Sequence, residues 1–398
     1  MSSTSVDLAV VGAGVAGCAL AAALRQRGWR GSLTLLEIGR GVGGRTATRR
    51  SRQDPGFALN HGAPLFNIGA NPEPWLLEPL RKGGWIAPFS GAIFSLDEQG
   101  RIGAAAPDAL SCGELWQGIP QMDGLCRGLL ALAQQGAPTE LKSSTLVRKL
   151  EPSASGEGWI LRDLAGQALL QSRWLVLSGS LLAHPRCQTF FGWSDIPLQQ
   201  AASELGDPEL LAACTALAAI ESTASSNLLL SLSEATASAW RQQPWRVLQF
   251  KAAASERWGI RRVSQQAMAN GGWGVVVEST DTIAQRFSGM FGSRSSAAQL
   301  LGSQPDSQAE AEVIHHLDRA LQGALGLSTS GAQKQLMRWG AAFPKPPGLH
   351  PQLSLCRNSR IGFCGDALEG MGFGRVEGAL RSAEALAQRL LETWTKGA

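Results

Sequence analysis

The feature that most constrains this chain is a short apolar strand that runs directly into three spaced glycines. Residues Val6–Val11 are largely apolar, and Gly12, Gly14 and Gly17 then open a helical segment rich in Ala and Leu. In a βαβ unit the first such glycine allows a tight turn, the second lets the backbone approach a pyrophosphate, and the third lets helix and strand pack closely. The free N–H groups and the dipole at the helix N-terminus favour that anion. The pattern predicts a dinucleotide-binding βαβ half.

An acidic residue after the next apolar segment narrows the choice of dinucleotide. Ser32–Leu36 is predicted to be a strand. Glu37 follows it about 20 residues beyond the glycines, where a carboxylate accepts hydrogen bonds from the adenosine ribose. A carboxylate there would repel a 2′-phosphate, so FAD or NAD is favoured over NADP. The glycines alone are a weak signal in a chain with 47 Gly, but the strand, helix and acid around them argue against a chance match.

A second glycine-rich signal stands near the C-terminus. A short apolar strand, Ile361–Cys364, leads to Gly365 and Asp366, and a glycine-rich turn then opens a long helix. As an alternative to a cofactor contact, Asp366 could serve only to cap this turn. The apolar residues of the helix keep helical spacing and predict one buried face, made of Val376, Ala379, Leu380, Ala383, Leu386, Ala387, Leu390 and Trp394.

Together with Gly41–Arg45 (GVGGR), these signals resemble the flavin amine oxidase superfamily, whose chains open with GxGxxG, an acid and GGR and close with a GD motif and a helix. The resemblance implies FAD, with Asp366 on the ribityl chain. It also implies that the last helix points its N-terminus at the flavin pyrimidine edge, where its dipole stabilises negative charge. Within the superfamily the chain is most similar to the renalase-like branch, through GAGVAG, GVGGRTATRR, FALNHGAPL, the RWG of Arg338–Gly340 and the closing helix.

The resemblance also assigns cofactor contacts residue by residue. It implies that Phe57–Phe66 passes the flavin ring and that Val147 packs against the adenine. Some relatives attach FAD through a cysteine, but neither Cys356 nor Cys364 stands in the matching motif, so noncovalent FAD is expected. The implied contacts are Gly12, Gly14, Ala16, Gly17, Glu37, Gly43, Gly44, Arg45, Ala63, Pro64, Leu65, Val147, Asp366, Gly372, Phe373 and Gly374.

One segment departs from the renalase pattern. Where renalases resemble D-x-G-A-Q-Y, this chain has Asn60–Leu65 (NHGAPL), which lacks the acid, the amide and the phenol. The chain contains no Tyr, so an aromatic cage would need Trp or Phe, and Pro64 removes a backbone donor that could have met the flavin. His61 in this turn could polarise the flavin O4 or a substrate, or it could only pack and hydrogen-bond.

The whole chain is predicted to be α/β (α+β overall). We expect a Rossmann-like FAD-binding domain with a β-meander, and a substrate domain with an antiparallel sheet above the flavin. The FAD-binding domain is expected to be discontinuous, with residues 1–75, 105–180 and 332–398. The substrate domain is expected to comprise residues 76–104 and 181–331.

Periodicity and turn residues predict further elements. The meander is expected from strands at Ser144–Arg148, Gly158–Asp163 and Arg173–Leu177. Strands of the substrate domain are expected at Leu228–Leu232, Arg246–Phe250, Trp258–Val263 and Val275–Glu278. Helices are expected at Pro120–Gln135, Pro208–Ile220 and Ser307–Leu325, and a polar loop at Ser293–Gln308.

Composition excludes several classes of partner. With 36 Lys+Arg against 32 Asp+Glu, the net charge of +4 is too small to indicate nucleic acid or a charged membrane surface. The basic cluster Arg45–Arg52 is interpreted as a loop beside the cofactor with solvated arginines. The 7 Cys form no CxxC pair and no metal-ligand spacing, so reduced thiols, no metal site and a cytoplasmic location are expected. Neither a leader nor a membrane span is expected, because no apolar run reaches about 18 residues.

These features predict an FAD-dependent oxidoreductase of the oxidase type. A small-molecule donor would give hydride to flavin N5, and O2 would reoxidise the flavin to give H2O2. In the renalase-like version the donor is an isomeric dihydronicotinamide dinucleotide, which needs no protein base. The alternatives are an amine or polyene oxidase or desaturase of the same superfamily, or a flavin-binding protein without turnover. A second GxGxxG for NAD(P)H is absent, because Gly370–Gly374 belongs to the closing motif.

Overall fold

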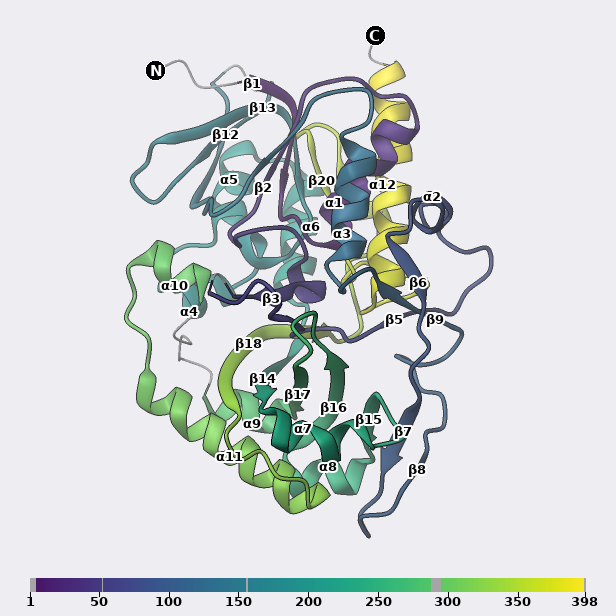
Figure 1. Cartoon of the computed structure of the whole chain (residues 1–398). Helices are drawn as coiled ribbons and strands as arrows, with labels where there is room; N and C mark the ends of the chain where they lie inside the picture. The colour runs from purple at the N-terminus through teal and green to yellow at the C-terminus, as the bar shows by residue number, and fades with distance from the viewer. Residues whose placement is uncertain (1–4, 52, 155–156, 288–294, 397–398) are drawn as a thin grey trace.

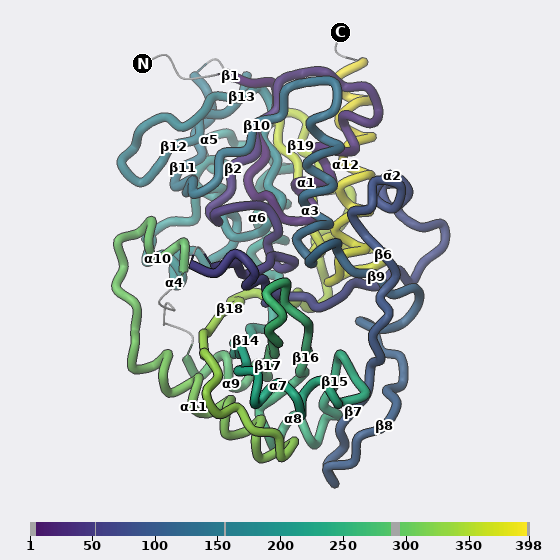
Figure 2. Tube along the Cα trace, in the orientation of Figure 1, coloured from purple at the N-terminus to yellow at the C-terminus, as the bar shows by residue number. Residues whose placement is uncertain are grey.

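Two large β-sheets organise the chain (Figure 1). The first sheet has eight strands and draws on both ends of the sequence, and the second has seven strands that come mainly from the middle. The computed structural model describes residues 5–51, 53–154, 157–287 and 295–396. In the trace of Figure 2, the segment around β3 runs between the two sheets, beside the curved strand β18. The two sheets therefore face each other across a junction to which the N-terminal region contributes.

The first sheet has the order β10-β2-β1-β13-β12-β11, with β20 on β13 and β19 on β20. Strands β10, β2, β1, β13 and β20 pair in parallel, so they all end at the same edge. Strands β11, β12 and β13 are antiparallel and form the expected β-meander. The bounds are β1 (Ser5–Val11), β2 (Leu33–Leu36), β10 (Thr139–Lys142), β11 (Lys149–Pro152), β12 (Trp159–Arg162), β13 (Ala168–Leu177), β19 (Leu355–Cys356) and β20 (Ile361–Phe363).

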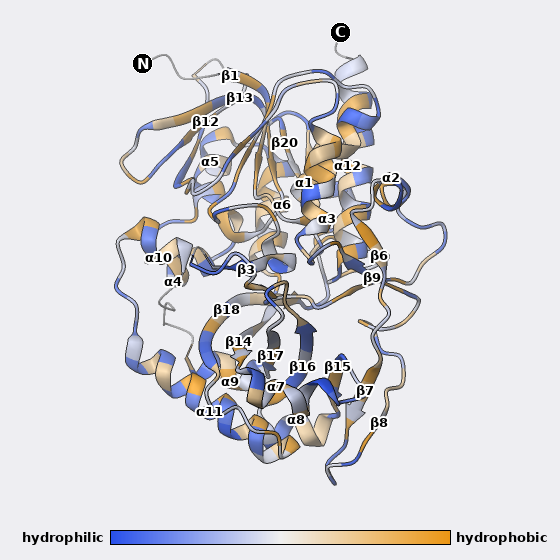
Figure 3. Cartoon of the chain, in the orientation of Figure 1, coloured by the Kyte–Doolittle hydropathy of each residue, from blue (hydrophilic) through white to orange (hydrophobic). Residues whose placement is uncertain are grey.

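Three helices cover one face of this sheet. Helix α1 (Val15–Gln26) lies against α3 (Gly124–Ala133) and α12 (Val376–Lys396). Because small alanines let its neighbours approach closely, α1 is buried from Val15 to Arg25. The predicted apolar face of α12 is confirmed for six of its eight residues, Ala379, Leu380, Ala383, Leu386, Ala387 and Leu390, which are all buried. The other two, Val376 and Trp394, are partly buried and pack against the same core. Figure 3 shows this alternation of apolar and polar residues along α12.

The second sheet has the order β18-β14-β17-β16-β15-β7-β8 and is antiparallel except for the β15–β7 pair. Helix α11 (Ser307–Leu325) packs on this sheet and buries Val313, Leu317 and Leu321 there (Figure 1). The bounds are β7 (Ile93–Leu96), β8 (Ile102–Ala104), β14 (Ser222–Leu232), β15 (Val247–Phe250), β16 (Ile260–Ala267), β17 (Trp273–Ser279) and β18 (Gln333–Pro344).

The remaining elements are short. A small sheet pairs β3 (Thr48–Arg50) with β4 (Ala58–Asn60), and another places β9 (Glu114–Gly118) between β5 (Phe66–Ile68) and β6 (Ile86–Pro88). The other helices are α2 (Leu77–Lys82), α4 (Arg186–Phe191), α5 (Pro197–Leu205), α6 (Pro208–Ala218), α7 (Glu234–Arg241), α8 (Ala252–Trp258), α9 (Asp281–Arg286), α10 (Ser296–Leu301), and the 3₁₀ turns η1 (Gly44–Thr46), η2 (Leu181–Ala183) and η3 (Pro351–Ser354).

Three local predictions are wrong. Ser144–Arg148 is not a strand, because the N–H groups of Ser144 and Thr145 donate to Gly39 and Glu37 in the loop after β2, and Ser144 has a positive φ of 51°. The expected loop Ser293–Gln308 contains α10, which Ser295 caps, while residues 293–294 lie outside the described residues. The arginines of Arg45–Arg52 are not simply solvated: Arg45 pairs with Asp366 and Arg50 with Asp123, and Arg52 lies outside the described residues.

The proposed division into domains stays a prediction, and two strands bear on its boundaries. Strand β18 starts two residues after the expected boundary at residue 331 and pairs with β14 of the second sheet. Strand β6 lies in the segment 76–104 and pairs with β9, not with the second sheet. Within the described part of the chain, no helix combines the length and the apolar composition needed to cross a membrane.

The close packing of α1 on the first turn gives a stability prediction. A methyl group on Gly17 would lie 2.1 Å from the carbonyl oxygen of Gly12. We therefore expect Gly17→Ala to lower the free energy of unfolding by about 1–3 kcal/mol, as overpacking does. Urea denaturation followed by circular dichroism measures this. Gly103→Ala is the control, because a methyl group there meets nothing within 4 Å. Equal losses in the two variants would contradict the packing role of Gly17.

Candidate functional site

The parallel strands of the first sheet bring four separate segments to one edge. Gly12 follows β1, Glu37 follows β2, Ser178 follows β13, and the pair Gly365–Asp366 follows β20 closely. Ligands of open α/β sheets bind at the carboxyl ends of the strands, because loops and helix N-termini converge there. This edge is therefore where the sequence signals from both ends of the chain meet.

The two glycine-rich loops lie directly against each other at this edge. The N–H of Gly43 donates to the carbonyl oxygen of Ala13 at 2.9 Å. A methyl group on Gly44, whose φ is +53°, would lie 3.2 Å from the Cα of Gly14. Side chains at Gly14 and Gly44 would fill the space between these two loops. The glycines therefore keep bare backbone facing the ligand site.

The start of α1 is suited to an anion. Gly14 is the N-cap residue and offers no side-chain cap, and the first turn of α1, all of it described, carries no acidic residue. The N–H groups at a helix N-terminus have no intrahelical partners, and the dipole favours negative charge. Gly14, Val15 and Ala16 line the cavity described below. This arrangement fits the pyrophosphate of a dinucleotide.

Glu37 is held in place by backbone donors. The N–H of Ala13 donates to its Oε2 and the N–H of Gly39 to its Oε1, each at 2.7 Å. Burial raises the pKa of this carboxyl above its ordinary value, although both hydrogen bonds oppose the increase. Carboxylate oxygens accept more than one hydrogen bond each, so Glu37 retains acceptor capacity toward a ribose.

A bidentate ion pair joins the two motifs. Arg45 Nη1 and Nη2 donate to the carboxylate of Asp366 at 2.7 and 2.5 Å, and Nη1 also donates to the carbonyl oxygen of Ala342 in β18 at 2.9 Å. Burial alone would lower the pKa of Arg45, but the Asp366 carboxylate offsets this and raises it. One guanidinium thus fixes the GGR turn, the closing motif and the second sheet relative to each other.

A cavity of about 430 Å³ runs from the glycine loops to the second sheet. This is a volume typical of small-molecule and cofactor sites. Both cofactor motifs contribute to its wall, although they are more than 300 residues apart in the chain. The predicted contacts that line it are Gly12, Gly14, Ala16, Glu37, Gly43, Gly44, Arg45, Ala63, Leu65, Val147, Asp366 and Gly374.

Four of the predicted contacts lie beside the cavity and do not line it. Gly17 packs on Gly12, and Gly372 packs so closely on Glu377 and Gly378 that a methyl group would lie 2.5 Å from the N–H nitrogen of Gly378. Phe373 packs against Gly348, and Pro64 also stands outside the lining residues. Gly17 and Gly372 therefore pack inside the two turns, away from the cavity.

His61 is buried beside the cavity, in the turn that departs from the renalase pattern. Its ring stacks on Trp339, with centroids 5.5 Å apart and planes 5° from parallel, and Trp339 lines the cavity while His61 does not. Its Nδ1 is buried without a hydrogen-bond partner among the described residues. Burial, with a smaller effect of Arg49, lowers the pKa of His61 from 6.5 to about 4. His61 is therefore neutral at physiological pH.

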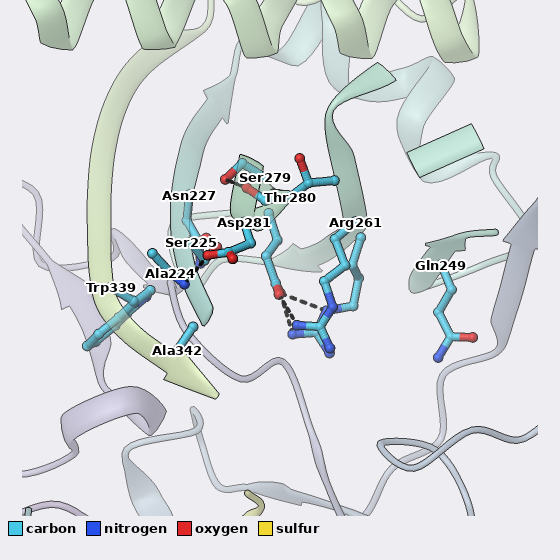
Figure 4. A network of polar contacts seen from close by, with 12 residues as sticks. Ala224, Ser225, Asn227, Gln249, Arg261, Ser279, Thr280, Asp281, Trp339 and Ala342 are labelled. Atoms are coloured by element: carbon cyan, nitrogen blue, oxygen red, sulfur yellow. Dashed lines mark hydrogen bonds and ion pairs between the residues drawn. The ribbon is translucent and has the colours of Figure 1, made fainter. Parts of the chain in front are cut away.

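Apart from Trp339, which belongs to the RWG motif and could face the flavin or only pack in the core, the residues at the far end of the cavity were not singled out from the sequence. They come from β14, β16, β17 and β18 and include most of the polar groups at that end (Figure 4). A charged pair interrupting an apolar strand, RR after Ile260, and an acid closing the apolar run before Ser279 are the signals that could have indicated them. The residues are Ser225, Asn227, Arg262, Glu278, Trp339, Ala341, Ala342 and Phe343.

A β-bulge explains how two consecutive arginines reach one carboxylate. Ile260 pairs with Ser279 and Arg262 with Glu278, so Arg261 is an extra residue in β16. Arg261 Nη1 donates to Glu278 Oε1 at 2.6 Å, and Arg262 Nε and Nη2 donate to Oε2 at 3.0 and 2.5 Å. Burial would raise the pKa of Glu278, but the two guanidinium groups hold it below its ordinary value.

Comparison with protein-family models supports the first half of this site. Residues 10–80 match the model of an NAD(P)-binding Rossmann-like domain. These residues include the glycine loop, Glu37, the GGR turn and the departing segment Asn60–Leu65. No curated protein sequence matches the chain.

Solved structures share the fold over nearly the whole chain. A putative protoporphyrinogen oxidase from Exiguobacterium sp. 255-15 matches with a TM-score of 0.60 and 14% identity, covering 98% of this chain and 100% of its own. Cyclohexylamine oxidase from Brevibacterium oxydans IH-35A matches with a TM-score of 0.64 and 14% identity, and putrescine oxidase bound to putrescine with 0.56 and 13%; each covers 98% of this chain and 99% of its own. The predicted fold class, Rossmann-like with a β-meander and an antiparallel second sheet, is confirmed.

The burial of His61 gives a pH-dependent prediction. Below pH 6.5 the unfolded chain binds a proton at His61, whereas the folded protein resists protonation until about pH 4. The stability that His61 contributes is therefore complete above pH 6.5 and is lost as the pH falls toward 4, by about 3 kcal/mol at most, at 1.36 kcal/mol per pKa unit.

We expect His61→Phe, which keeps a ring against Trp339, to reduce the loss of unfolding free energy between pH 6.5 and 4 by roughly that amount. Denaturant titrations at several pH values measure the slope. Ser203→Ala, which is exposed on α5 and removes no titrating group, is the control and should keep the wild-type slope. If both variants follow the wild-type curve, His61 is not the titrating group.

Proposed function

We propose that this protein is an FAD-dependent oxidoreductase of the oxidase type. The observation that carries the proposal is that one cavity is lined by the N-terminus of α1, by the Arg45–Asp366 pair and by polar residues of the second sheet. A dinucleotide could lie along this cavity with its reactive ring at the junction of the two sheets. The similarity in fold to cyclohexylamine and putrescine oxidases is consistent with it.

The residues of the first sheet would hold the cofactor. The N–H groups at the start of α1 and the bare backbone of Gly14 and Gly44 would bind the pyrophosphate, and Glu37 would accept hydrogen bonds from the adenosine ribose. Asp366 would remain near the ribityl chain, oriented by Arg45. Noncovalent binding is favoured because burial raises the pKa of Cys364 to about 12, which keeps that thiol protonated and unreactive.

FAD supplies a two-electron acceptor, to which a bound donor gives a hydride and from which O2 then takes the electrons to form H2O2. This chain's residues bind and orient the donor. The carboxylates that line the cavity within the described residues are all engaged: Glu37 by two N–H groups, Asp366 by Arg45, and Glu278 by two arginines. A donor that releases hydride without a protein base is therefore favoured.

The renalase-like form of the proposal meets this requirement. An isomeric dihydronicotinamide dinucleotide expels hydride through its nitrogen lone pair and needs no general base. Trp339 and Phe343 line the cavity and could contact the donor ring. An amine or a polyene donor, or a flavin-binding protein without turnover, remain the alternatives to be separated by assay. We also propose a reducing, cytoplasmic location, in keeping with seven free cysteines of which six are buried.

The cofactor assignment predicts a preference between flavins. Glu37 and the start of α1 would contact the AMP half of FAD, which FMN lacks. We therefore expect the protein to bind FAD and to bind FMN at least tenfold more weakly. Glu37→Ala should weaken FAD binding about tenfold or more and leave FMN binding unchanged, since FMN lacks the ribose that Glu37 addresses. Equilibrium dialysis measures both, with the exposed Glu256→Ala as control. Equal affinities for FAD and FMN would contradict the assignment.

The reaction itself predicts a spectroscopic change. We expect the flavin absorbance of the FAD-loaded protein to bleach anaerobically with isomeric dihydronicotinamide dinucleotides and to recover in air with one H2O2 per donor. An amine panel and a polyene run beside them test the alternatives. If an amine alone bleaches the flavin, the renalase-like form is wrong and the oxidase class stands. If no donor bleaches it, the protein binds flavin without this turnover.

A further inference from the structure

The polar cluster at the far end of the cavity carries an excess of positive charge. Arg261, Arg262 and Glu278 form it, and two guanidinium groups share one carboxylate. The Glu278 side chain is 6% exposed and that of Arg262 12%, so this pair is shielded from bulk water, whereas Arg261 is 38% exposed and partly hydrated. A buried guanidinium donor that has no acceptor is costly unless a ligand supplies one.

The geometry leaves donor groups toward the cavity. Arg262 uses Nε and Nη2 on Glu278, and its Nη1 makes no hydrogen bond to a described residue. Arg262 lines the cavity together with Ser225 and Asn227 of β14, and Phe343, over which Arg261 stacks at 4.0 Å, lines it as well. In Figure 4, Ser225, Asn227 and Trp339 lie on the left of the view, and Arg261 lies to the right of them.

The polar side chains of β14 that line the cavity beside the cluster carry no charge. Asn227 Nδ2 donates to the carbonyl oxygen of His61 at 2.8 Å, and Ser225 Oγ donates to Asn227 Oδ1 at 2.5 Å, so both are uncharged and already paired. His61 is neutral at physiological pH, as argued above. Of the cluster, Arg262 and Glu278 line the cavity, whereas Arg261 does not and is 38% exposed, so what the cluster offers a ligand is the Nη1 of Arg262. Asp281 lies nearby in Figure 4 and accepts from the N–H of Ala224 at 2.6 Å.

We propose that the donor oxidised in this cavity carries an oxyanion, a carboxylate or a phosphate, which binds at Arg262 with the added field of Arg261. A planar guanidinium recognises either group through its fork of N–H donors. A cationic amine would bring a like charge to Arg262 and no acceptor, and a polyene would leave the Nη1 of Arg262 without an acceptor. The inference rests on the proposed function for the cofactor that lies next to the donor.

The test compares ligands of one shape and different charge on the FAD-loaded protein. Phenylacetate, phenyl phosphate, 2-phenylethanol and phenethylamine are titrated by calorimetry, and shifts in the bound flavin spectrum are recorded alongside. We expect at least one of the two anions to bind about tenfold or more tightly than the alcohol, and the amine to bind weakest. The anion that binds more tightly shows whether the site prefers a carboxylate or a phosphate. Similar affinities for the anions and the alcohol would overturn the proposal.

Variants locate the effect. Arg262→Gln should abolish the preference for the anion, and Arg262→Lys should keep part of it, because charge remains without the fork. Arg261→Gln should weaken binding of the anion severalfold and reduce the dependence of that binding on salt concentration, while binding of the alcohol stays unchanged. Arg257→Gln, exposed on α8, is the matched control and should change nothing. An anion preference that survives Arg262→Gln and Arg261→Gln would place the anion elsewhere and refute the assignment.

Two outcomes separate this inference from the proposed function. If the protein binds FAD but shows no anion preference, the inference fails and the oxidoreductase proposal stands. If the protein binds no FAD, the oxidoreductase proposal fails, and the difference between the wild type and Arg262→Gln in anion titrations still tests the site. Should Arg262→Gln not fold, Arg261→Gln and the salt dependence of the wild type decide.

Discussion

The bidentate pair between Arg45 and Asp366 is the contact on which the arrangement of this protein depends. It joins residues 321 positions apart in the chain, and the same guanidinium also binds the Ala342 carbonyl of β18. Removing one partner of such a pair would leave an uncompensated charge beside the cavity. The pair therefore holds the N-terminal turn, the C-terminal motif and the second sheet in one geometry, and the cavity lies where these three meet.

Parallel pairing explains why the motifs converge there. Strands β2, β1, β13 and β20 run in the same direction, so each delivers its following loop to one edge, and the N-terminus of α1 points to the same place. The first and last segments of the chain could not form this site without β13 between them. Segments that are far apart in the sequence therefore line the same side of the cavity. Strand β18 of the second sheet lines the opposite side.

Sequence reasoning located the first half of the site because its constraints are local. Close backbone approach requires glycine at positions such as Gly17 and Gly44, and a buried helix face requires the spacing found in α12. It failed where tertiary contacts override the pattern, as at Ser144, whose N–H bonds to the loop after β2. It also missed Arg262 and Glu278, because only the bulge in β16 and the pairing with β17 bring them together.

The charged cluster is difficult to explain by stability alone. An apolar strand could fill the same space, and replacing a buried ion pair by well-packed apolar residues is often neutral or stabilising. Here the bulge adds an arginine beyond the one needed to pair Glu278, and the Nη1 of Arg262, which lines the cavity, has no acceptor among the described residues. Since the carboxylates of the described cavity wall are all engaged, none of them accepts from that donor or serves as a free base. A ligand that brings its own negative charge and gives up hydride unaided satisfies both conditions at once, and this couples the recognition of the donor to the chemistry proposed for it.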